Sequence, residues 1–104
     1  MPTFVMLTRL AHGSLKSPRG LEDLEKDVMA RIETQCPDVK WLTSYAVFGP
    51  YDYLDTFEAP DLDSAAKVSA IVRTFGHAHT EIWPAMPWRH FKKLIGDIPA
   101  MVSD

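Results

Sequence analysis

The sequence contains only one cysteine, Cys36, among 104 residues. A single thiol excludes an internal disulfide bond and a zinc site built from several cysteines, and it is typical of a reducing compartment. The first residues lack the basic region, apolar stretch and cleavage site of a secretory signal. No apolar run is long enough to cross a bilayer. We therefore expect a cytoplasmic protein with no membrane partner.

Basic residues are also few. Eleven lysines and arginines stand against fourteen acidic residues, which gives a formal net charge of −3. Because binding to phosphate backbones requires a clustered basic surface, no nucleic-acid partner is expected. The sequence has no glycine-rich phosphate loop, HExxH, CxxC or Ser-His-Asp arrangement. The common hydrolase, kinase and redox mechanisms are therefore unsupported, and the cofactor is left unknown.

What the chain does contain is a series of strand-like and helix-like segments within one domain, residues 1–104. Alternating side chains rich in β-branched and aromatic residues predict strands at 3–10, 39–48, 53–58 and 77–83. Apolar residues at helical spacing predict amphipathic helices from Pro18 to the stop at Cys36-Pro37 and from about 61 to 75, and a shorter one from about 87 to 96. Gly76 stands where a left-handed residue commonly ends a helix.

The order of these segments is βαββαβ with a terminal helix. Right-handed crossovers then favour an α+β, ferredoxin-like fold, with a four-stranded antiparallel sheet, two helices on one face and a short C-terminal helix. In this topology the spatial order of the strands is fourth, first, third, second. The first strand is therefore central, which agrees with apolar residues on both of its faces.

A turn between the second and third strands divides the chain. Gly49 can take positive φ, Pro50 fixes φ at the second position of a turn, and Asp52 can accept a hydrogen bond from a nearby backbone N–H. These residues predict a hairpin.

The two faces of the predicted sheet differ. We expect small and apolar side chains against the helices: Phe4, Met6, Leu10, Leu42, Ala46, Phe48, Ala78, Thr80 and Ile82. We expect aromatic and a few ionisable side chains on the opposite face: Val5, Leu7, Arg9, Trp41, Thr43, Tyr45, Tyr53, Asp55, Phe57, His77, His79, Glu81 and Trp83. Because such a patch is rarely left in water, the same face of a second chain, or the C-terminal helix, should cover it. A two-fold homodimer is the simplest arrangement.

Several short motifs resemble the GYD domain family. They are Gly49-Pro50-Tyr51-Asp52, Asp55 in the following strand, Glu58-Ala59-Pro60-Asp61, and Phe75-Gly76 before His79-Thr80-Glu81. Pro50 departs from the family's Gly-Tyr-Asp signature because it separates the glycine from the tyrosine. The resemblance implies a dimeric α/β barrel over most of the chain. In related barrels the space between the sheets holds haem, quinones or polyketide-like aromatic molecules.

Three functions are compatible with this fold. The first is a homodimer that binds a small, planar or apolar molecule between its sheets, through Arg9, Trp41, Tyr45, Tyr53, Phe57, Glu81 and Trp83. The second is a cofactor-independent or metal-assisted enzyme, similar to monooxygenases or isomerases, with His79, His77 and Asp55 as catalytic residues. The third is a structural, stress-associated dimer with a dry interface.

The ionisable candidates also have structural interpretations. His77 and His79 project to one face of a strand about 7 Å apart, so a third ligand, namely Glu81, Asp55 or His90, would complete a metal site. Their interpretation as surface residues is the stronger one, and we assign no metal ligand.

Arg9 and Asp55 are expected on neighbouring strands of the same face, and this predicts a buried ion pair. Alternatively, Arg9 binds a carboxylate or phenolate ligand and Asp55 or His79 acts as the general base. The aromatic residues form either a stacking box for a planar ligand or the core between two sheets.

Overall fold

A computed structural model of the chain describes residues 1–11 and 18–99. Its elements are β1 (Thr3–Leu10), α1 (Pro18–Gln35), β2 (Lys40–Ala46), β3 (Tyr53–Glu58), α2 (Leu62–Phe75), β4 (Ala78–Ala85) and α3 (Trp88–Gly96). The four strands form one antiparallel sheet in the order β2-β3-β1-β4. The predicted α+β, ferredoxin-like fold and its strand order are confirmed.

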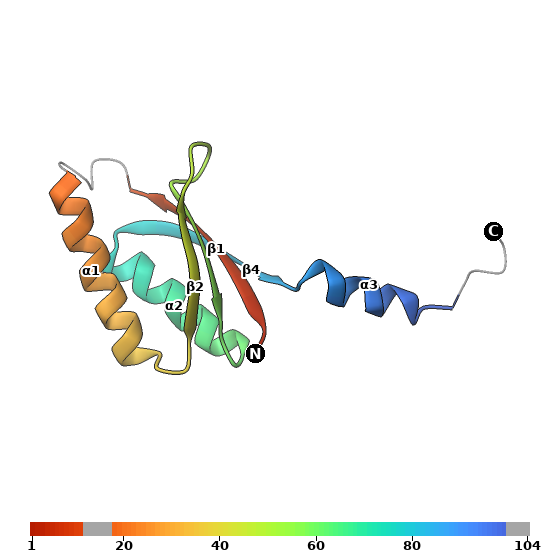
Figure 1. The fold of residues 1–104 in the computed structure, drawn as a ribbon. Coiled ribbons are helices and arrows are strands. Elements are labelled where there is room, and N and C mark those ends of the chain that lie inside the picture. Colours follow the sequence, from red (N-terminus) through yellow and green to blue (C-terminus); the bar gives the residue numbers. More distant parts are fainter. Residues whose placement is uncertain (12–17, 100–104) are drawn as a thin grey trace.

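Figure 1 shows the layers of the molecule. The helices α1 and α2 lie over one face of the sheet, which we call the helix side, and the opposite face, the open face, has neither helix over it. The third helix, α3, continues from the end of β4 and stands clear of the rest of the chain.

The core lies on the helix side and is centred on Phe57, which is fully buried. Its ring stacks between those of Phe4 and Trp41, with centroid distances of 5.8 and 5.2 Å. The side chains that α2 places in the same core include Ala65 and Val68. Small residues on the helix leave room for the large aromatic residues of the sheet, which explains why this face accommodates three stacked rings.

The strand register corrects the predicted face of β3. Phe57 pairs with Phe4, Asp55 with Met6, and Tyr53 with Thr8. Because paired residues of neighbouring strands point to the same face, Tyr53, Asp55 and Phe57 all lie on the helix side. Their predicted position on the open face is wrong. The largest apolar side chain of β3 pairs with Phe4, and the other two residues follow by alternation.

A β-bulge corrects the face of Trp41. The register of β2 and β3 shifts between Trp41 and Thr43, so that Trp41 pairs with Phe57 while Thr43 pairs with Thr56. An extra residue in one strand reverses the alternation beyond it. Trp41 is therefore on the helix side and not, as predicted, on the open face. Thr43 and Tyr45 follow the bulge and lie on the open face by register.

The predicted open face is confirmed along β4. Arg9 pairs with His79, Leu7 with Glu81, and Val5 with Trp83. These pairs alternate with those of Phe4, Met6 and Thr8, which face the helices, and the open face consequently carries Arg9, His79, Glu81 and Trp83.

Several predicted boundaries are wrong. His77 precedes β4 and, with φ of 51°, is itself the left-handed residue, whereas Gly76 is right-handed. A side chain at position 76 would lie 2.5 Å from the carbonyl oxygen of Val72, so the glycine is required by close packing.

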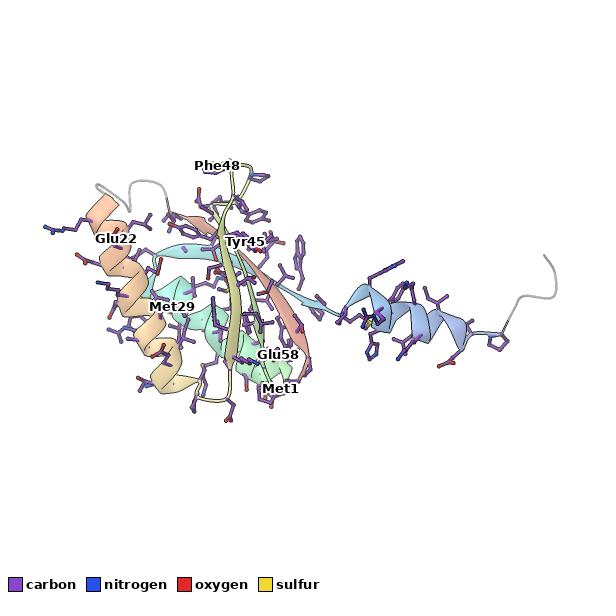
Figure 2. The ribbon with its side chains drawn as sticks, viewed as in Figure 1. Met1, Glu22, Met29, Tyr45, Phe48 and Glu58 are labelled. Carbon is purple, nitrogen blue, oxygen red and sulfur yellow. The ribbon has the colours of Figure 1, made fainter. Side chains whose placement is uncertain are left out.

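Pro84 belongs to β4, which tolerates a missing N–H because it is an edge strand. Phe48 lies outside the core at the hairpin tip, 98% exposed (Figure 2).

Candidate ligand cavity between the first helix and the sheet

A cavity of about 360 Å³ lies between α1 and the helix side of the sheet. This volume is within the range of small-molecule binding pockets. Figure 2 shows Met29, one of its wall residues, on the side of α1 that faces the sheet. The walls are mostly apolar, with hydroxyl and carboxyl groups from both the sheet and the helix. They are formed by Met6, Thr8, Leu10, Leu21, Leu24, Glu25, Val28, Met29, Ile32, Trp41, Ser44, Tyr45, Ala46, Tyr53, Asp55, Val72, Gly76 and Ala78.

Small side chains account for the cavity. Ser44 and Ala46 follow the bulge in β2, Ala78 begins β4, and Gly76 ends α2. None of these four residues can fill the space below α1, whereas Phe57 and Trp41 fill the neighbouring part of the same layer. The cavity therefore begins where the aromatic stack ends.

The hydroxyl of Thr8 is the most unusual group in this cavity. Thr8 is 3% exposed, and its Oγ1 atom has no hydrogen-bond partner within the described part of the chain. Leaving a buried hydroxyl unpaired costs about 1–3 kcal/mol. The hydroxyl is thus available to a polar group of a molecule bound in the cavity.

Asp55 brings a carboxyl group to the same cavity. Burial raises the pKa of Asp55 above its ordinary value, and the charge of Glu25 raises it further. Hydrogen bonding from the Ser44 and Trp41 side chains acts in the opposite direction. The Trp41 indole N–H donates to Ser44 Oγ at 2.8 Å. These neighbours place Asp55 where it can accept a proton or a hydrogen bond from a ligand.

Tyr53 brings a second ionisable group of β3 to the cavity, besides Asp55. Burial raises the pKa of the Tyr53 phenol, and the charges of Asp52, Glu25 and Asp55 add to this effect. The phenol is therefore kept in its neutral form, in which it can donate a hydrogen bond.

The hairpin between β2 and β3 is fixed to β1 by Asp52. A carboxylate oxygen of Asp52 accepts from the Leu10 N–H at 2.8 Å, and the Asp52 N–H donates to the Thr8 carbonyl at the same distance. The Asp52 carbonyl accepts from the Val47 N–H at 3.0 Å. The prediction that Asp52 accepts a backbone hydrogen bond is confirmed, although the donor belongs to β1. These bonds hold the strand ends that carry Thr8 and Tyr53.

The residues predicted to share one pocket lie on two sides of the sheet. Trp41, Tyr45, Tyr53 and Asp55 all line the cavity, although Tyr45 belongs to the open face by register. Phe57 forms the adjacent core. Arg9, Glu81, Trp83 and His79 lie on the open face, away from the cavity, and His77 is exposed before β4.

The separation of the two faces overturns the predicted ion pair. Arg9 pairs with His79 on the open face, while Asp55 pairs with Met6 on the helix side. The sheet itself lies between the two charges, so they do not pair. Arg9 instead borders a shallow depression together with Arg73, His77 and His79.

A metal site is not found among the residues that the structure describes. Within 1–11 and 18–99, no three or more histidine, cysteine or carboxylate side chains come together as a metal would require. The suggested third ligands of His77 and His79 are dispersed, because Asp55 is on the other face and His90 is in α3.

Sequence reasoning missed Thr8, Ser44 and Glu25 as cavity residues. A signal for Thr8 existed, since it is a polar residue inside a strand whose neighbours Met6 and Leu7 are buried. Ser44 alternates with Ala46, which was expected against the helices, so its face could be predicted, whereas the bulge that brings Trp41 to the same side has no mark in the sequence.

Comparison with known proteins gives a matching family model and a related protein. The GYD domain model matches residues 4–95. A Thermus thermophilus protein described as "Glutamine synthetase and cystathionine beta-lyase binding protein" is 30% identical over 95 residues, covering 84% of this chain and 90% of its own length. Among the described helices, none combines the length and apolar character needed to cross a membrane.

Solved structures with similar folds support the architecture alone. One is Arabidopsis thaliana At3g17210, with a TM-score of 0.53 and 15% identity, covering 84% of this chain and 95% of that one. A second is the hypothetical protein PHS023 of Pyrococcus horikoshii, with a TM-score of 0.53 and 22% identity, covering 86% and 95%. A third is FFRP-DM1, with a TM-score of 0.51 and 24% identity, covering 83% and 100%.

Proposed function

Because the chain belongs to the GYD domain family and has a cavity beneath α1, we propose that it binds a small, planar or apolar molecule there. The observation that carries this proposal is the unpaired Thr8 hydroxyl, buried in an otherwise largely apolar wall. A ligand with one hydroxyl or amide group would satisfy Thr8 and Asp55 while its remaining surface contacts the apolar residues. The position differs from the site between two sheets that the sequence suggested.

The open face supports a second part of the proposal, a homodimer. Trp83 is 50% exposed and Tyr45 is 58% exposed on this face, and the register places Leu54 between Tyr45 and Leu7 of β1. Pairing the open faces of two chains would remove this apolar surface from water. Sedimentation velocity at micromolar concentration should therefore give the mass of a dimer, and a monomer would disprove this part.

The ligand proposal is tested with 2-naphthol, a planar probe with one hydroxyl group. We expect saturable binding by isothermal titration calorimetry, weakened about 5- to 10-fold by Thr8→Val, which is the effect of one lost hydrogen bond. Thr43→Val is the matched control, because the Thr43 hydroxyl bonds to Thr56 on the open face. Equal affinities for both variants would mean that the probe does not use Thr8.

A catalytic version of this proposal depends on Asp55. The histidines suggested as bases, His77 and His79, do not line the cavity, whereas Asp55 does and has a raised pKa. An enzyme of the monooxygenase or isomerase type would therefore use Asp55 as its base. Replacing Asp55 by asparagine should abolish turnover of any substrate found, and retained turnover would exclude this role.

A second candidate function, protein binding, is favoured by the Thermus thermophilus relative. Its described partners are two enzymes, and the exposed apolar residues of the open face and α3 give this chain a surface for such contacts. Sedimentation of the protein with purified glutamine synthetase or cystathionine beta-lyase from its own organism tests this idea. The absence of a faster complex with either enzyme would remove it.

A further inference from the structure

The C-terminal helix α3 has no packing surface on its own chain. None of its nine residues is buried, and Figure 2 shows its side chains standing clear of the sheet, α1 and α2. The radius of gyration is 17.0 Å, against about 13 Å for a compact chain of this length. The long axis of the molecule measures 60 Å because α3 extends it.

This helix nevertheless has a sharply divided surface. At 100° per residue, Trp88, Phe91, Leu94 and Ile95 fall on one side, and all four are exposed apolar residues. The rings of Trp88 and Phe91 contact each other at a centroid distance of 5.5 Å. A nine-residue helix is too short to be stable by itself in water. Its apolar side therefore requires another surface.

We propose that α3 is an arm exchanged between two copies of this chain, each α3 packing its apolar side on the partner protomer. The inference rests on the proposed homodimer and adds a second contact to the pairing of the open faces. The exposed apolar residues available for this contact are Trp83 on the open face and Met86 in the link after β4, each 50% exposed.

The link between β4 and α3 favours the partner over the arm's own sheet. Pro84 and Pro87 stand on either side of Met86, and each fixes its own φ angle. Pro87, with φ of −57° and ψ of 140°, is extended and continues the direction of β4 into α3. The arm therefore extends beyond the end of its own sheet. A second protomer that packs on that sheet would offer the arm a surface to contact.

Charge also favours a second copy. Three of the eleven basic residues and none of the fourteen acidic residues lie in α3, so the rest of the chain has eight basic against fourteen acidic residues. By register the open face carries two carboxylates, Glu58 and Glu81, and two basic residues, Arg9 and Lys40. Glu58 pairs with Thr3, which in turn pairs with Ala85 at the point where the arm departs. The complementarity is thus one of net charge, between a basic arm and a partner chain that is acidic outside its own arm.

Hydrogen exchange of the full chain tests the arm. If α3 packs on a second copy, protection of residues 88–95 should rise with protein concentration, in parallel with the dimer fraction measured by sedimentation. Protection that does not change with concentration would show that α3 folds back on its own chain and would overturn the inference. Rapid exchange in a chain that sediments as a dimer would overturn it too, while leaving the homodimer intact.

Two charge-matched variants provide an independent test. Trp88→Glu/Phe91→Glu and Arg89→Gln/Lys93→Gln each change the net charge by −2, but only the first removes apolar arm residues. We expect the first to raise the dimer dissociation constant about 10-fold or more, since buried aromatic side chains dominate such interfaces. The second should change it less than about 3-fold at 0.15 M salt, where exposed charges are screened. Equal effects of the two variants would contradict an apolar contact.

An amphipathic basic helix can also bind an anionic membrane. Vesicle binding by the same protein samples tests whether α3 binds a membrane instead of a second chain. Vesicles of phosphatidylglycerol should not sediment the dimeric wild-type protein. Vesicle binding that requires Trp88 and Phe91, together with a monomeric chain in solution, would overturn the exchanged arm. Binding of 2-naphthol to the cavity is measured separately, so failure of the arm and failure of the ligand proposal are distinguishable.

Discussion

Thr8 and Thr80 are direct cross-strand partners in β1 and β4, and both are buried, yet within the described part of the chain only the Thr80 side-chain hydroxyl has a hydrogen-bond partner. The Thr80 hydroxyl bonds to the Ser69 hydroxyl of α2. Thr8 instead lines the cavity beneath α1. Two identical side chains in adjacent positions therefore differ: the Thr80 hydroxyl joins β4 to α2, whereas the Thr8 hydroxyl is the group that we propose a ligand contacts.

This difference predicts opposite effects of the same substitution. Thr8→Val should raise the free energy of unfolding by about 1 kcal/mol, because it removes an unpaired hydroxyl without changing the shape of the side chain. Thr80→Val should lower it by about 1–2 kcal/mol, since it leaves the Ser69 hydroxyl without its partner. Urea denaturation measures both. If Thr8→Val destabilised the protein as much as Thr80→Val, the Thr8 hydroxyl would not be unpaired.

Asp55 predicts a dependence of stability on pH. Burial raises its pKa in the folded chain, so its contribution to stability is full below the pKa of an unfolded aspartate and is lost as the pH rises through the folded pKa. The asparagine of the Asp55→Asn variant cannot ionise, so this variant does not lose stability in this way as the pH rises. The melting temperature of Asp55→Asn relative to the wild type should therefore increase between about pH 3.5 and pH 7.

Asp61 is the control, because its pKa is shifted in the opposite direction to that of Asp55. As the N-cap of α2, it accepts from the Ser64 N–H at 2.8 Å, and hydrogen bonding with Ser64 lowers its pKa. Its contribution is present above the unfolded pKa and is lost as the pH falls through the folded pKa. Asp61→Asn should therefore lose stability relative to the wild type as the pH rises over the same range. Parallel curves for the two variants would refute the burial of Asp55.

The bond from the Leu10 N–H to Asp52 predicts that the family's aspartate is structural. Asp52→Ala removes this acceptor and should lower the free energy of unfolding by about 1–2 kcal/mol. Asp23→Ala, an exposed position of α1, is the control and should change it by less than about 0.5 kcal/mol. Equal stability of the two variants in urea would show that the Asp52 side chain does not fasten the hairpin.

Gly76 predicts a strict requirement for glycine at the end of α2. In Gly76→Ala the new methyl group would meet the Val72 carbonyl at 2.5 Å, and overpacking of this kind costs about 1–3 kcal/mol. Gly49→Ala places its methyl group in open space and should change stability by about 0.5 kcal/mol or less. Thermal unfolding of both variants checks the pair, and an unchanged melting temperature for Gly76→Ala would contradict the close contact.

The fold could be predicted because its determinants are local. Apolar residues at helical spacing, such as Val28 and Ile32, are buried as their spacing requires, and the two prolines Pro18 and Pro37 stand at the ends of α1. The order of the elements then leaves few topologies. These signals depend on residues that are close in sequence, and the elements that they predict are present in the structure.

The faces of the sheet could not be predicted because they depend on pairing between strands. The bulge after Trp41 reverses the alternation of β2, and the pairing of Phe57 with Phe4 fixes that of β3. Neither event has a local mark, and a shift of one residue moves every side chain to the other face. For this reason the sequence suggested a site on the open face, whereas the cavity lies on the helix side.

The central claim is that a small molecule binds between α1 and the sheet. The most direct measurement is a nuclear magnetic resonance titration of the protein with 2-naphthol, using the methyl groups of Val28 and Ile32 as reporters of the cavity. The Leu54 methyl groups and the Trp83 indole N–H report the open face. We predict saturable shifts at Val28 and Ile32 that are weakened in Thr8→Val. Shifts confined to Leu54 and Trp83, or no shifts at all, would contradict the account.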